Sequence, residues 1–139
     1  VGPSLDELRA IAGPTVTFHG RVDERAIVEL LEACRALCVA ATEDFGMAAV
    51  EAHAAGKPVV AFAAGGALET VREGVSGALF EELSEDALLQ AIARADALPT
   101  SPGDLAALAR RFSAEVFGER CRELIGCALA ERSLSRQST

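Results

Sequence analysis

The sequence predicts an α/β fold in which one parallel sheet carries helices on both faces, giving three layers. Apolar or β-branched runs alternate with segments of helical periodicity, and turns containing glycine or proline separate them. This alternation favours βαβ units, whose strands run parallel. The runs lie at residues 15–19, 36–40, 59–62 and 78–80. We therefore expect about four strands in one Rossmann-like sheet.

The first third of the chain predicts a helix, a strand and a second helix. Ser4 and Glu7 have the spacing of a capping box, so the first helix should begin beside them. Residues 15–19 are rich in β-branched side chains, which favour a strand. Asp23 is placed to cap the second helix, whose apolar residues recur at helical spacing as far as Cys34.

The middle of the chain predicts a strand, a loop and a helix in direct succession. The apolar run Ala36–Ala40 is typical of a buried strand. After the loop comes a helix of small residues, Ala48–Ala55, which Gly56-Lys57-Pro58 ends. Open α/β sheets bind ligands at the carboxyl ends of their strands, so the loop between strand and helix is the expected site.

The rest of the chain adds two short strands and then only helices. Residues 59–62 predict a strand that leads into the small, flexible loop 63–66. From Ser84 onward the apolar residues recur only at helical spacing, and the last apolar stripe, Val116–Leu129, is expected to be core. We predict a single, partial Rossmann-like domain over residues 1–131 and a disordered tail over residues 132–139.

Composition narrows the class of partner and the compartment. The net charge of -8 and the lack of a basic stripe argue against nucleic acid as a ligand. The cysteine spacings are not those of zinc sites, so we expect no metal site and reduced, buried thiols. Together with the absence of a signal peptide or an apolar run long enough to span a bilayer, this favours the cytoplasm and leaves membrane contact open.

The stretch Glu43–Glu51 carries the clearest chemical signal. Two carboxylates, with seven residues between them, lie on either side of the point where loop becomes helix. The free N–H groups at a helix start attract an anion, whereas carboxylates accept hydrogen bonds from hydroxyl groups. The stretch therefore predicts a site for a phosphorylated, polyhydroxylated ligand.

This stretch resembles the E-x7-E motif of the retaining glycosyltransferases of family four, which have the two-Rossmann-domain (GT-B) fold. Further segments match in the same order and spacing: Val16–Gly20, Gly56–Ala61, Gly65–Val71 and Gly77–Phe80. The resemblance covers roughly residues 3–125 and concerns the C-terminal, donor-binding domain of that family. It implies transfer of a hexose from a nucleotide-diphosphate sugar with retention of configuration, without a cofactor or a bound metal.

The resemblance also implies a role for each candidate site residue. Glu43, the implied catalytic residue, would contact hydroxyls of the transferred sugar, and Glu51 would bind the ribose. The implied donor-binding residues further include the backbone of Phe45, Gly46 and Met47, the base-side loop at Gly20 and Arg21, and the donor-facing loop with Gly65, Gly66 and Glu69. The segment Gly65–Val71 is similar to mannosyltransferase-like members, which suggests GDP-mannose as the donor.

Parts of the family's pattern have no counterpart in this sequence. These are the first two strands of the domain, the Arg and Lys that clamp the diphosphate, and the N-terminal acceptor domain. We therefore expect a gap in the sheet, self-association of the isolated chain, and no transfer by residues 1–139 alone. The alternatives are a non-catalytic nucleotide or nucleotide-sugar binding module, a fragment inactive on its own, or a sugar-nucleotide epimerase of similar fold.

Overall fold

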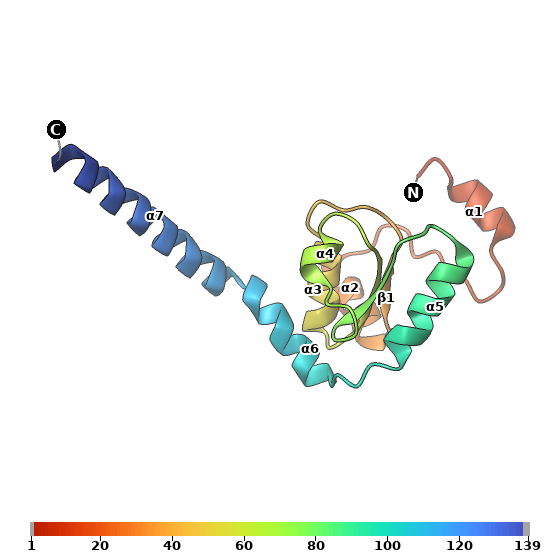
Figure 1. Ribbon diagram of the computed structural model, residues 1–139. Helices are drawn as coiled ribbons and strands as arrows, with labels where there is room; N and C mark the ends of the chain where they lie inside the picture. Colours follow the sequence, from red (N-terminus) through yellow and green to blue (C-terminus); the bar gives the residue numbers. More distant parts are fainter. Residues whose placement is uncertain (1, 138–139) are drawn as a thin grey trace.

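A three-stranded parallel sheet forms the centre of the computed structural model, which describes residues 2–137 and the side chains of residues 2–129 (Figure 1). The strands are β1 (Leu37–Val39), β2 (Val59–Phe62) and β3 (Gly77–Phe80), in the order β1-β2-β3. Leu37 pairs with Val59, and Val59 pairs with Gly77. The α/β class and the parallel direction of the strands are confirmed.

Helices surround this sheet, and the last of them extends away from it (Figure 1). They are α1 (Leu5–Ile11), α2 (Glu24–Ala33), α3 (Met47–Ala54), α4 (Ala67–Thr70), α5 (Glu85–Asp96), α6 (Pro102–Ala109), the 3₁₀ turn η1 (Arg110–Phe112) and α7 (Ala114–Gln137). The Asp23 side chain caps α2 as predicted, with its Oδ1 2.9 Å from the Ala26 nitrogen. Ser4 precedes α1 without a side-chain cap, so the predicted capping box is absent.

The two faces of the sheet have separate apolar cores. Val59 and Ala61 of β2 pack with buried residues of α3 and α4 on one face. Val60, which lies between them, packs with Ala91 and Ala95 of α5 on the other face. Side chains of a strand alternate between faces, so a strand buried on both sides must be apolar throughout, as β2 is.

The predicted strand over residues 15–19 does not form, so the expectation of four strands is wrong by one. Residues 16–20 have no regular secondary structure, and the Val16 N–H donates to Gly13 within the same turn rather than to a neighbouring strand. An extended segment becomes a strand only when a second strand pairs with it. Within the described residues, the sheet offers this segment no adjacent partner, consistent with the predicted gap.

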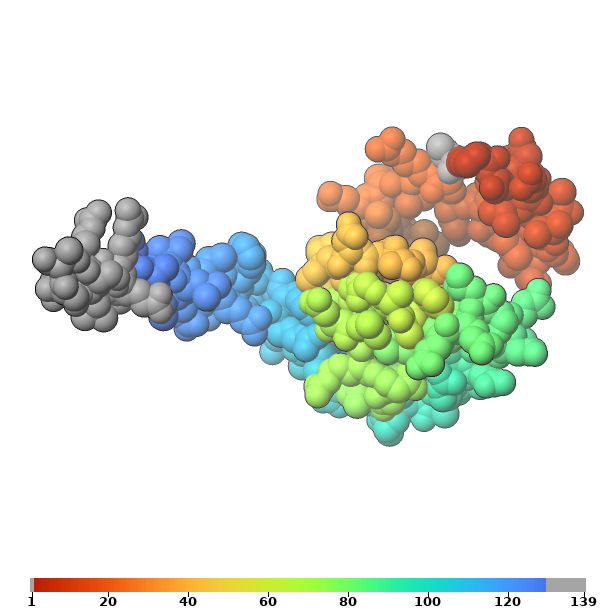
Figure 2. Space-filling view, turned by 45° about the horizontal axis from the view of Figure 1, so that its top comes forward, coloured from red at the N-terminus to blue at the C-terminus, as the bar shows by residue number. Residues whose placement is uncertain are grey.

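The C-terminal helix α7 also differs from expectation. Its apolar stripe was expected to be core, yet Phe117 is 69% exposed and Leu124 is 71% exposed. The helix leaves the body of the molecule after η1 and projects away from it (Figures 1 and 2). It continues through residue 137, over most of the segment for which the sequence predicts a disordered tail, and residues 138–139 lie outside the described residues.

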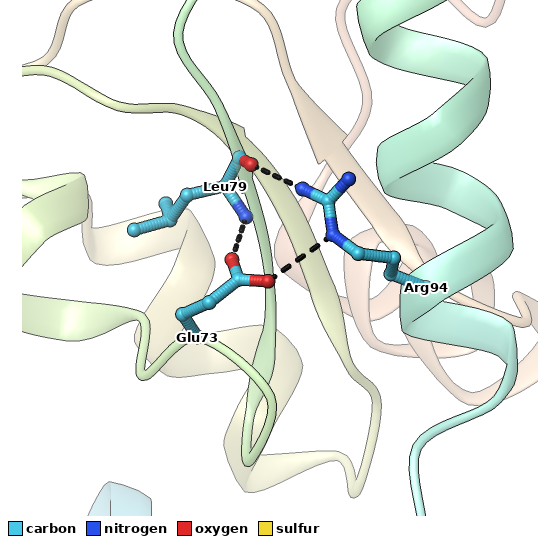
Figure 3. A network of polar contacts seen from close by, with 3 residues as sticks. All are labelled: Glu73, Leu79 and Arg94. Atoms are coloured by element: carbon cyan, nitrogen blue, oxygen red, sulfur yellow. Dashed lines mark hydrogen bonds and ion pairs between the residues drawn. The ribbon is translucent and has the colours of Figure 1, made fainter.

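The outer edge of β3 is closed by two side chains (Figure 3). The Leu79 nitrogen lies 2.5 Å from Oε2 of Glu73, and the Leu79 carbonyl oxygen lies 2.5 Å from a guanidinium nitrogen of Arg94. Glu73 and Arg94 also pair with each other, with Oε1 and Nε 3.2 Å apart. These contacts occupy the backbone groups that a further strand would need, so β3 is protected as an edge.

Replacing Arg94 with methionine should lower the free energy of unfolding by about 1 kcal/mol, because a half-exposed ion pair and a backbone hydrogen bond are lost together. Arg25→Met is the matched control, since Arg25 makes an exposed pair with Glu29 inside one helix and should cost only a few tenths of a kcal/mol, roughly the value of such pairs. Urea denaturation of both variants measures the difference. If both variants lose the same free energy of unfolding, then the contacts of Arg94 at the edge of β3 do not contribute to stability.

The opposite edge of the sheet is open. Among the described residues, β1 pairs with β2 alone, and no side chain caps its outer edge as Glu73 and Arg94 cap β3. Unpaired strand edges and exposed apolar residues promote association. We expect the isolated chain to self-associate at micromolar concentration, measured by light scattering. A stable monomer that binds no apolar dye would contradict this expectation.

Candidate functional site

The site begins where the loop after β1 turns into α3. Gly46 has a left-handed backbone conformation, with φ of 83°, and its carbonyl accepts the Ala49 N–H at 3.0 Å. A side chain at this position would be strained and would approach Thr70 Oγ1 to 3.2 Å. The N–H groups of Met47 and Ala48 carry no hydrogen bond to another described residue, so they are free to bind an anion.

A second loop, Gly65-Gly66, lies directly against the first. The Gly66 nitrogen donates to the Glu43 carbonyl oxygen at 2.7 Å, and Glu43 forms a parallel bridge with Gly65. A Cβ atom on Gly66 would lie 2.2 Å from the carbonyl carbon of Phe45, so only glycine allows this approach. The structure thus brings together two motifs that are about twenty residues apart in the sequence.

The two glutamates of the motif lie in different surroundings. Glu43 is half-buried, and its Oε2 lies 3.9 Å from the position that a Cβ on Gly46 would take, close to the start of α3. Glu51 is exposed on α3 and lines a hollow of about 480 Å³ beside α2, together with Glu24 and Ile27. Both carboxylates remain available to accept hydrogen bonds from hydroxyl groups.

The remaining residues of the two loops expose their side chains. Phe45 is 40% exposed, and Met47, the first residue of α3, is 58% exposed. Glu69 of α4 is also exposed, while its carbonyl accepts a hydrogen bond from the Arg111 guanidinium. The residues Glu43, Phe45, Gly46, Gly65 and Gly66 therefore belong to two loops in direct contact, with Glu69 on the helix that follows.

Gly20 and Arg21 line a different hollow. It has a volume of about 930 Å³ and lies between α1 and residues 17–21 (Figure 2). Its wall includes Arg9, whose guanidinium lies 5.8 Å from the centre of the Phe18 ring, and the exposed His19. Within the described residues, this hollow shares no lining residue with the one that contains Glu51, so the predicted base-side loop is not joined to the rest of the site.

His53 of α3 is buried in the interior behind the two loops. It is 1% exposed, and its Nδ1 lies 3.1 Å from the Lys57 carbonyl oxygen. Burial lowers the pKa of His53; the backbone of Lys57 and Thr70 acts in the opposite direction, and the charge of Arg111 lowers it further. The His53 side chain is therefore part of the buried interior of α3.

Three residues that support the site were not recognised in the sequence. Thr70 is 2% exposed and donates from Oγ1 to the Gly66 carbonyl at 2.9 Å. Its spacing of four from Gly66 could have indicated this contact, because threonine in a helix bonds to the carbonyl one turn back. Arg111 and Phe112 contact the site from η1, and no local pattern in the sequence connects them to residues so far away.

Three further findings concern metal ligands, membrane spans and cysteines among the described residues. No group of three or more His, Cys, Asp or Glu side chains among them is arranged to hold a metal ion. None of the helices in the described part of the chain combines the length and the apolar character needed to cross a bilayer. Cys38 and Cys127 are exposed free thiols rather than the buried ones expected from the sequence.

The sheet, its helices and the paired loops define a Rossmann-like domain in which the Glu43 loop and the Gly65-Gly66 loop meet at the carboxyl ends of β1 and β2. The family model for glycosyl transferases group 1 matches residues 7–112. The chain therefore belongs to this family of glycosyltransferases, as the E-x7-E stretch led us to expect.

Curated relatives and solved structures agree with this assignment. A D-inositol 3-phosphate glycosyltransferase of Streptomyces griseus is 39% identical over 93 residues, covering 65% of this chain and 20% of its own length. A D-inositol 3-phosphate glycosyltransferase of Mycolicibacterium vanbaalenii is 43% identical over 81 residues, covering 56% of this chain and 18% of its own length. The chain thus spans about a fifth of the length of these relatives.

The solved structures show the same fold. HepE of Anabaena, in complex with UDP and glucose, superimposes with a TM-score of 0.61 at 31% identity, over 81% of this chain and 32% of HepE. HepE in complex with UDP-glucose superimposes with a TM-score of 0.57 at 32% identity, over 73% of this chain and 30% of HepE. The described domain accordingly corresponds to part of a GT-B glycosyltransferase.

Gly66→Ala should lower the free energy of unfolding by about 1–3 kcal/mol, because the added methyl group meets the Phe45 backbone, which must move. Gly126→Ala is the control, since a Cβ there meets no atom within 4 Å and alanine favours the helix. Urea denaturation of both variants is the measurement. A Gly66→Ala variant as stable as the parent would show that the two loops are not in close contact.

Proposed function

We propose that this chain is the donor-binding part of a retaining glycosyltransferase that transfers a hexose from a nucleotide-diphosphate sugar. The observation that carries the proposal is the contact between the Glu43 loop and the Gly66 loop, at the start of α3. It brings the segment that carries the Glu43 carboxylate and the free N–H groups of α3 against the Gly65-Gly66 pair. The membership of the glycosyl transferases group 1 supports a donor of this class.

We assign a different part of the donor to each element. The N–H groups of Met47 and Ala48 suit the diphosphate, since the start of a helix favours negative charge. Glu43, half-buried beside them, suits the hydroxyls of the hexose, and Glu51, one turn further along α3, suits those of the ribose. Transfer itself needs the acceptor and the remainder of a longer protein.

Two observations point to different donors. The segment Gly65–Val71 resembles mannosyltransferase-like members, which favours GDP-mannose. HepE, in contrast, was solved with UDP and with UDP-glucose. Competition between UDP and GDP for the chain, measured by calorimetric titration, decides between the two nucleotides. Binding of both nucleotides without transfer in the longer protein would instead favour a non-catalytic binding module.

Substitution of the two glutamates should affect different kinetic constants in the longer protein. The ribose does not change during transfer, so Glu51→Ala should raise KM for the donor more than it lowers kcat. The hexose develops positive charge as its bond to the diphosphate breaks, so Glu43→Gln should lower kcat by ~10²-fold or more, the loss typical of removing one electrostatic stabiliser. Donor kinetics and nucleotide titration of both variants measure the split.

Glu82→Ala serves as the control, because Glu82 is exposed beyond β3 and lies on neither loop. Free nucleotide diphosphate should bind the Glu43→Gln variant normally and the Glu51→Ala variant more weakly. If Glu43→Gln retains the parental kcat, or Glu51→Ala retains the parental nucleotide affinity, then the assignment of roles is wrong.

A further inference from the structure

The short turn η1 touches both halves of the candidate site from behind. It lies about seventy residues after the Glu43 loop in the sequence and connects α6 to α7. Phe112 contacts the Glu43 loop through Phe45, and Arg111 contacts α4 through the carbonyl of Glu69.

The contact of Phe112 with Phe45 is edge-to-face. The two ring centres are 5.6 Å apart and the ring planes are at 88°. Aromatic pairs of this geometry contribute beyond the area that they bury. On its other side, the Phe45 backbone lies against Gly66, where an added Cβ would come within 2.4 Å of the Phe45 Cα. Phe45 is thus held between η1 and the Gly65-Gly66 loop.

Arg111 connects η1 to α4. Its guanidinium donates to the Glu69 carbonyl and lies 4.4 Å from the centre of the Phe112 ring, so the two η1 side chains support each other. Thr70, the next residue after Glu69, donates to the Gly66 carbonyl. Contacts therefore run from Arg111 through α4 to Gly66, and the Gly66 N–H in turn donates to the Glu43 carbonyl oxygen.

We propose that Phe112 and Arg111 are positioning residues for the donor site: they hold the Glu43 loop and α4 together, so that Glu43 and the free N–H groups of α3 keep one geometry. The positioning role for a sugar donor rests on the proposed function. The holding of the two loops does not, because it concerns contacts within the chain itself.

The amide of Gly66 reports on this role directly, because its hydrogen bond to Glu43 joins the two loops. In the 139-residue chain, Phe112→Leu should speed hydrogen exchange at Gly66 about tenfold, equivalent to about 1.4 kcal/mol. The Val59 amide, which donates to Ser76 within the sheet, should exchange as in the parent. Phe112→Tyr keeps the ring and should restore protection at Gly66.

The matched control is Phe62→Leu, which removes an aromatic ring from the other core. Phe62 pairs with Phe80 at a similar distance of 5.7 Å and packs on the α5 side of the sheet. This variant should leave the Gly66 amide protected. In the double variant Phe45→Leu with Phe112→Leu, exchange at Gly66 should be no faster than in the faster single variant, because the pair is already lost.

The outcomes separate positioning from general stability. Faster exchange at Gly66 alone supports the proposal. Equal acceleration at Gly66 and Val59 shows a purely structural role and overturns it, as does an unchanged Gly66 rate or a Gly66 amide without protection in the parent. Titration with UDP and GDP then tests the donor role: weaker binding by Phe112→Leu is expected. A parent that binds neither nucleotide contradicts the proposed function, while the exchange result still judges the contact between the loops.

Discussion

One backbone hydrogen bond, from the Gly66 amide to the Glu43 carbonyl, is the constraint on which the site depends. It requires Gly66 to lie so close to Phe45 that no side chain fits between them. It also sets where α3 begins, because Gly46 must turn through a left-handed conformation immediately after the contact. The charged and free polar groups of the site then follow from that one position of the backbone.

The two edges of the sheet differ in whether their outward backbone groups are hydrogen-bonded, and this difference determines where the sheet ends. Glu73 and Arg94 satisfy the outward backbone groups of Leu79, so β3 ends the sheet. Within the described chain, the outer edge of β1 has no comparable cover. Residues 16–20 do not pair with another strand and have no regular secondary structure, because an extended segment cannot become a strand by itself.

Much of the fold and part of the site follow from local sequence. The strands β1, β2 and β3 and the capping residue Asp23 were predictable, because apolar runs and helix capping depend on neighbours in sequence. The burial expected for β1 does not hold, since Cys38 is exposed and its two neighbours are only half-buried. The exposure of Phe117 and Leu124 was not, since apolar spacing predicts a stripe but not what covers it. The contribution of Phe112 to the site also escaped, because it depends on contact across the whole domain.

The separation of the two cores by the sheet has a practical consequence for engineering. The α3 and α4 side carries the loops, whereas the α5 side, with Val60 and Ala91, touches none of the candidate site residues through its core. Substitutions on the α5 side can therefore change the stability of the domain without contacting the two loops. Substitutions meant to reshape the loops belong on the α3 and α4 side.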